Sequence, residues 1–80
     1  MKALSPGFFR PLSGVGSGTS VVLRRIRGGQ DLLNRLLALG FVPGATVEVR
    51  HNERSGPLLV AVKGDRIMLG RGMAEKMMVE

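Results

Sequence analysis

Residues 31–44, with the sequence DLLNRLLALGFVPG, constrain the fold more than any other part of the chain. Leucines at 32, 33, 36 and 37 recur at helical spacing and predict one short amphipathic helix. Gly40 stands where a helix ends in left-handed backbone, which glycine adopts at little cost. Phe41 follows at the position from which a Schellman ending packs an apolar side chain against Leu36. The Pro43-Gly44 pair then predicts a turn into a strand.

The rest of the chain is typical of short strands separated by turn residues. In the first strand, a bulge near Arg24 and Arg25 would return Ile26 to the buried face. Gly64-Asp65 predicts a two-residue, glycine-first type II′ hairpin connection. Residues 1–11 are interpreted as a flexible tail, and residues 12–80 as the domain. The predicted strands are 19–27, 46–51, 58–63, 66–69 and 77–80.

These elements predict a mainly β protein with about five strands and one α-helix between strands one and two. Short strands at close spacing in 80 residues favour a small closed barrel, because closure removes exposed sheet edges. We expect the leucine stripe of the helix to plug one mouth of this barrel. Truncation of Leu36 should then leave a cavity that destabilises the domain by ~2–5 kcal/mol.

The charge balance narrows the class of partner. Twelve Lys and Arg residues face six Asp and Glu residues, a net charge of +6. This excess favours nucleic acid, anionic lipid or an acidic protein surface. No apolar run approaches the ~20 residues of a membrane-spanning helix. We expect no secretory signal, because Ser5, Pro6 and Gly7 interrupt the N-terminal region. The absence of cysteine fits a reducing cytoplasm.

Catalytic and metal-binding patterns are scarce. His51 is the one histidine, no spacing supports a Ser-His-Asp group, and no phosphate-binding loop motif is present. His51 and Glu53 are two residues apart and could project from one face as weak metal-ligand candidates, but two ligands do not close a site. We interpret them as a strand-end histidine beside an exposed glutamate, and leave open a weak site shared between two molecules. The methionines favour core packing over soft-metal binding.

Nucleic-acid binding is the alternative from another functional class. Arg24, Arg25 and Arg27 cluster on the first strand, and Arg50, Arg54 and Arg66 could lie near them. However, binders of single strands usually stack bases on aromatic side chains, and this chain has three Phe and no Tyr or Trp. The composition therefore makes a nucleic-acid surface the weaker interpretation.

Several short motifs follow one another along nearly seventy residues of the chain. Two positions depart from the pattern of the family that these motifs resemble. Gly56-Pro57 has no acidic residue between its two members, and Met77 and Met78 stand where β-branched residues are commoner. The motifs are Leu12-Ser13 with Val15 and Gly18, Arg35-Leu36, Leu39-Gly40-Phe41, Pro43-Gly44 with Val47 and Val49, Gly56-Pro57, Gly64, Leu69-Gly70-Arg71, Ala74 and Val79. Together they resemble the FeoA family of bacterial ferrous iron uptake. The SH3-like domain of this family also occurs at the C-terminus of iron-dependent repressors of the diphtheria toxin repressor type.

The resemblance implies an SH3-like barrel in a non-catalytic cytoplasmic accessory protein. It implies a partner in FeoB, the membrane Fe(II) transporter with a cytosolic G domain, and transfers no catalytic or cofactor-binding residue. The alternative is a small basic nucleic-acid-binding or regulatory module, and the oligomeric state is open. We expect a partner-binding groove between loops and sheet, rimmed by arginines. Its predicted residues are Leu33, Leu37, Phe41, Arg24, Arg25, Met73 and Met77.

Overall fold

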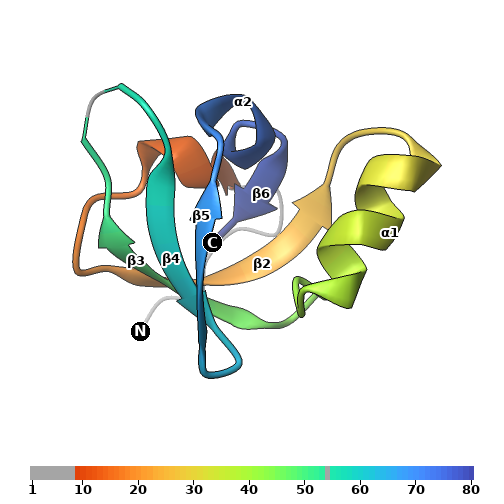
Figure 1. The fold of residues 1–80 in the computed structure, drawn as a ribbon, viewed down its shortest axis with the longest axis horizontal. Helices are drawn as coiled ribbons and strands as arrows, with labels where there is room; N and C mark the ends of the chain where they lie inside the picture. The colour runs from red at the N-terminus through yellow and green to blue at the C-terminus, as the bar shows by residue number, and fades with distance from the viewer. Residues whose placement is uncertain (1–8, 54) are drawn as a thin grey trace.

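The computed structural model describes residues 9–53 and 55–80. It consists of short strands, two short helical turns and one longer helix, α1 (Figure 1). The strands are β1 (Arg10–Pro11), β2 (Ser20–Ile26), β3 (Thr46–His51), β4 (Leu58–Val62), β5 (Asp65–Leu69) and β6 (Met77–Val79). The helices are the 3₁₀ turn η1 (Leu12–Gly14), α1 (Gln30–Ala38) and α2 (Arg71–Ala74).

The strands form one antiparallel sheet in the order β1-β6-β2-β3-β4-β5. The mainly β class is confirmed, but the prediction of five strands in a closed barrel was wrong. The described part of the sheet has six strands, and β1 and β5 at its two ends do not pair. One reason that β1 does not pair with β5 is its length of only two residues, of which Pro11 has no N–H to donate. Because Arg10 and Pro11 pair with β6, the ordered fold begins inside the predicted tail, whose residues 1–8 lie outside the described range.

Two local predictions for the strands had different outcomes. The bulge is confirmed, because the β2–β6 register shifts between Leu23 and Arg25. The hairpin turn was wrong. β4 ends at Val62 and β5 begins at Asp65, so the two loop residues are Lys63 and Gly64, with φ of 52° and 85°. Two positive φ values are typical of a type I′ turn, whose twist matches that of the flanking strands.

The end of α1 confirms the predicted Schellman motif. Gly40 has φ 99°, its N–H donates to the Leu37 carbonyl at 3.0 Å, and the Phe41 N–H donates to the Leu36 carbonyl at 3.0 Å. Pro43 and Gly44 then occupy the centre of a turn closed by Ala45 N–H to the Val42 carbonyl at 2.9 Å. Gly44 has φ 91°, as the third position of a type II turn requires.

The core lies between the curved sheet and the short helical turns. Alternate strand residues point inward, and no buried polar side chain occurs in the part of the chain that the structure describes. Its largest fully buried side chains are Phe41, Leu12, Leu23, Leu36, Leu58, Leu69 and Met77, followed by Val15, Val47, Val49, Val60 and Val62.

Helix α1 does not plug the sheet as predicted. Leu36 is buried, Leu32 and Leu33 are half-buried, and Leu37 keeps 42% of its surface exposed. Figure 1 shows why: α1 stands to one side of the sheet instead of lying across its end. Only the centre of the leucine stripe therefore reaches the core.

Candidate functional site

The exposed flank of α1 is the first candidate surface. Leu33 and Leu37 are four residues apart and so share one side of the helix; Leu37 is exposed and Leu33 is half-buried. Leu39, just after the helix, is 45% exposed on the opposite flank of the stripe. The apolar side chains that α1 offers on this side are thus Leu37, which is 42% exposed, and the half-buried Leu33. We call Leu33 and Leu37 the α1 flank.

The other predicted apolar residues of the groove do not join this surface in the same way. Phe41 and Met77 are both 0% exposed, so the expectation that they contact a partner was wrong. Phe41 is drawn into the core by the Schellman ending, and Met77 by the inward-facing register of β6. Met73 in α2 is half-buried and packs against the core.

The two predicted arginines differ in their environment. The Nε atom of Arg24 lies 3.0 Å from Oε2 of Glu80, so a carboxylate already pairs with its charge. Arg25 is exposed, and no described side chain forms an ion pair or hydrogen bond with it. Arg25 is therefore the better placed of the two to meet an acidic partner.

Basic side chains gather at a second place, on the outer face of β2–β5. Arg50, Lys63 and Arg66 line a shallow hollow of about 470 Å³, together with small residues such as Ser20 and Ala61. Glu48 lies within it, and its Oε1 is 3.3 Å from Nη1 of Arg50. The structure thus brings Arg50 and Arg66 together, but Arg24, Arg25 and Arg27 do not line this hollow, and Arg54 lies outside the described residues.

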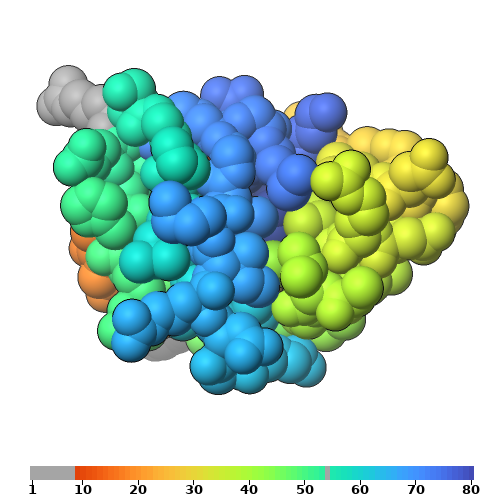
Figure 2. All heavy atoms as spheres, viewed as in Figure 1, coloured from red at the N-terminus to blue at the C-terminus, as the bar shows by residue number. Residues whose placement is uncertain are grey.

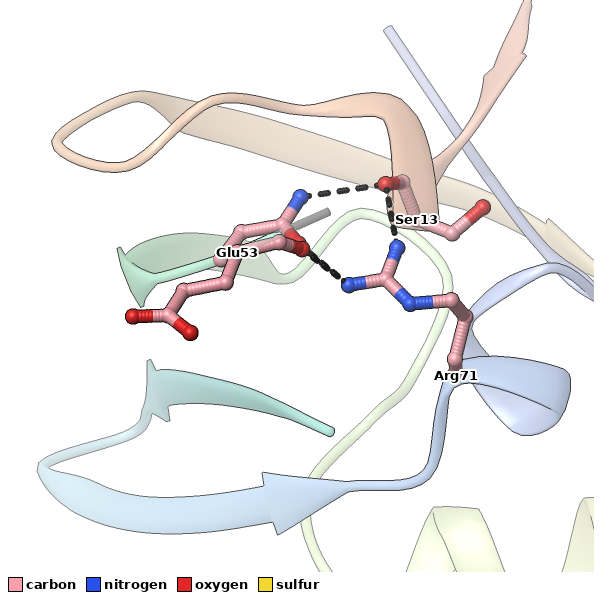
Figure 3. A pocket seen from close by; sticks show the side chains of 4 residues that line it. Ser13, Glu53 and Arg71 are labelled. Carbon is pink, nitrogen blue, oxygen red and sulfur yellow. Dashed lines mark hydrogen bonds between the residues drawn. The ribbon is translucent and has the colours of Figure 1, made fainter. Parts of the chain in front are cut away.

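Arg71 organises a third site, which sequence reasoning missed. This half-buried guanidinium donates to the carbonyls of Gly56 (3.0 Å), Ser13 (3.3 Å) and Glu53, and to Oδ1 of Asn52 (2.7 Å). Figure 3 shows the guanidinium of Arg71 pointing towards Ser13. Asn52 Nδ2 donates to Ser13 at 3.0 Å and to the Val15 carbonyl at 2.7 Å.

These bonds decide what the Arg71 site can do. Because most of the five guanidinium N–H groups already have neutral oxygen acceptors, Arg71 is a tether and not an open anion receptor. It joins the start of α2 to η1 and to the loop between β3 and β4. The one sequence signal was its place in the closing family motif, which says nothing of its acceptors.

The weak metal-ligand candidates are in contact with each other. Nε2 of His51 lies 3.1 Å from Oε2 of Glu53, and both side chains are well exposed. Within residues 9–53 and 55–80, no group of three or more His, Cys, Asp or Glu side chains could hold a metal ion. The pair therefore supplies at most two protein ligands.

One finding concerns membranes. Among the helices of the described chain, none has the length and apolar character needed to cross a bilayer.

Comparison with known proteins identifies the family. A family model described as "FeoA domain" matches residues 10–80. The chain belongs to the FeoA family. A relative named "Putative Fe(2+) transport protein A", from Methanocaldococcus jannaschii, is 36% identical over 70 residues, which are 88% of this chain and 84% of the relative. The resemblance drawn from the sequence motifs, and with it the association with ferrous iron transport, is confirmed.

Solved structures agree with this assignment. A crystal structure of an iron uptake regulatory protein, FeoA, has a TM-score of 0.85 and 34% identity, and the match covers 91% of this chain and 97% of that one. Stenotrophomonas maltophilia FeoA, described as complexed with zinc and as an SH3 domain protein, has a TM-score of 0.76 and 29% identity over 88% of each chain. A manganese-dependent transcriptional repressor shares the fold alone, at TM-score 0.83 and 20% identity, covering 98% of this chain and 44% of the repressor.

Proposed function

We propose that this FeoA-family protein is a non-catalytic accessory protein of ferrous iron uptake that binds the cytosolic portion of the FeoB transporter. The observation that carries the proposal is the α1 flank, which leaves Leu37 42% exposed in a helix that stands away from the sheet. The family match places the chain among ferrous iron transport proteins. Function at the cytoplasmic face of the membrane, without a resident cofactor, is part of the same proposal.

The α1 flank has the chemistry of a site for an amphipathic helix. Helix-in-groove contacts use apolar side chains spaced by three or four residues, as Leu33 and Leu37 are. The net charge of +6 also favours a partner segment with an acidic margin, and Arg25 is exposed for that role. The arginine would mainly speed association, whereas the leucines would slow dissociation.

Titration of the protein with the purified cytosolic domain of FeoB tests this proposal. We expect saturable binding at low salt, and Leu33→Ala and Leu37→Ala should each weaken it by roughly 5- to 30-fold, as truncation of a buried apolar contact does. Met68→Ala is the matched control, because Met68 is 61% exposed but lies on β5. Equal binding by the leucine variants and the control, or no binding at low salt, would contradict the proposal.

Two further measurements complete the test. GTP turnover by the FeoB domain, with and without saturating protein, shows whether docking modulates the transporter. Reversal of charge in Arg25→Glu should reduce affinity most at low salt while leaving the far-ultraviolet circular dichroism spectrum unchanged. The family match does not favour the nucleic-acid alternative, and tight sequence-selective DNA binding would be the result that revives it.

A further inference from the structure

Strand β5 has one side that the described sheet leaves unpaired. It stands last in the strand order, and among the described residues only β4 pairs with it. Its extensive contacts are likewise with β4, and α1 stands to one side of it in Figure 1. In Figure 2 the atoms of β5 reach the surface between those of β4 and those of α1. One long side of β5 thus offers main-chain groups to another strand.

The register identifies which main-chain groups these are. Val62 pairs with Asp65 across the two-residue loop, and in such a hairpin this first pair exchanges both hydrogen bonds. Alternation then makes Ile67 and Leu69 the next residues that bond to β4. Arg66 and Met68 therefore turn their N–H and C=O groups away from β4, towards the open side.

This edge has only part of the usual protection against pairing. Natural sheets guard their edges with proline, bulges or charged residues. The β4–β5 register is continuous, so β5 contains no bulge, and it has no proline. Its charged residues, Asp65 and Arg66, occupy the first two positions, and residues 67–69 are uncharged. Met68 is also 61% exposed, so its side chain is largely open on the outer face of the strand.

We propose that this edge accepts an extended segment of a partner protein, which adds a strand beside β5 and carries an acidic side chain opposite Arg66. The acidic character follows from the outer face, where Arg66 shares its hollow with Arg50 and Lys63 against one carboxylate, that of Glu48. On the other face of the strand Ile67 is only half-buried, and it favours an apolar side chain opposite it. The segment therefore alternates acidic and apolar residues.

A partner segment fits this edge better than a second copy of the chain. Two β5 strands paired about Ile67 would join through only five residues of each chain. They would also bring two positively charged outer faces together. The site is separate from the α1 flank and does not rest on the proposed binding of FeoB.

Nuclear magnetic resonance with two capped seven-residue peptides tests the proposal. One alternates valine with glutamate, and the other alternates valine with lysine. We expect the glutamate peptide to shift the amide signals of Arg66 and Met68 and to slow their hydrogen exchange, while the lysine peptide binds about tenfold more weakly. No shift at these amides with millimolar glutamate peptide, equal binding of both peptides, or shifts centred on α1 would overturn it.

Two variants of one residue separate edge pairing from side-chain contact. Met68→Pro removes an N–H that does not bond to β4, so the β4–β5 pairing should survive, as unchanged exchange protection of Ile67 and Leu69 would show. We expect it to weaken peptide binding by more than tenfold, whereas Met68→Ala, which keeps the N–H, should stay within about threefold. Equal affinity of the two variants would overturn the proposal. So would light scattering that shows a concentration-dependent dimer lost in Met68→Pro.

Discussion

Replacement of Arg71 offers the sharpest test of how this small sheet is held together. The guanidinium makes four hydrogen bonds to two chain segments that are distant in sequence, the farthest acceptor lying 58 residues away. Lysine keeps the charge at this position but has no planar fork of donors. Arg71→Lys therefore removes the geometry of the tether while the net charge stays at +6.

The magnitude follows from the acceptors. A hydrogen bond from a charged donor contributes about 1.5–3 kcal/mol when buried, and less at this half-buried position, where freed carbonyls of the loop can bind water. We therefore expect Arg71→Ala to lower the free energy of unfolding by about 2–4 kcal/mol and Arg71→Lys by about 1–2 kcal/mol. An 80-residue domain has only about 4–12 kcal/mol of stability, so Arg71→Ala should lower Tm by roughly 10–20 °C.

Far-ultraviolet circular dichroism during heating and urea unfolding is the appropriate assay, because the chain has no Trp or Tyr for fluorescence. Arg25→Ala is the matched control, since Arg25 is exposed, and should change stability by no more than about 0.5 kcal/mol. A double-mutant cycle with Asn52→Ala should show coupling above about 0.5 kcal/mol, because Asn52 and Arg71 share the Ser13 carbonyl. Wild-type stability in Arg71→Lys would refute the tether.

Three further predictions concern the core, the helix end and metal binding. Leu36→Ala should destabilise the protein by about 2–5 kcal/mol in urea unfolding, because Leu36 is the one fully buried residue of α1. Gly40→Ala should lower Tm, because Gly40 has φ 99° and a Cβ there would lie 3.4 Å from Cγ of Lys63. Gly72→Ala is the control and should be neutral or slightly stabilising, because a Cβ at this position of α2 meets open space. Calorimetric titration with Zn²⁺ should show no saturable site at micromolar concentration, because His51 and Glu53 supply only two ligands; tight binding that is lost in His51→Ala would contradict this.

Local patterns in the sequence were enough for α1 and for five of the six described strands, all but β1. The end of α1 was predictable because a Schellman motif depends on residues within one helical turn, and Gly40 and Phe41 occupy its positions. The strands were predictable because inward and outward residues alternate at period two, as in TVEVRH of β3. The ordered motifs also sufficed for the family, which the match over residues 10–80 confirms.

Only the tertiary structure decided which of these surfaces are accessible. The same leucine stripe fits a helix that plugs a barrel and one that stands beside an open sheet, because its periodicity shows a face and not the depth of burial. Phe41 and Met77 became core residues and Leu37 a surface residue through that packing. The Arg71 tether and the open edge of β5 depend on hydrogen bonds between distant segments, and spacing along the chain carries no record of such partners.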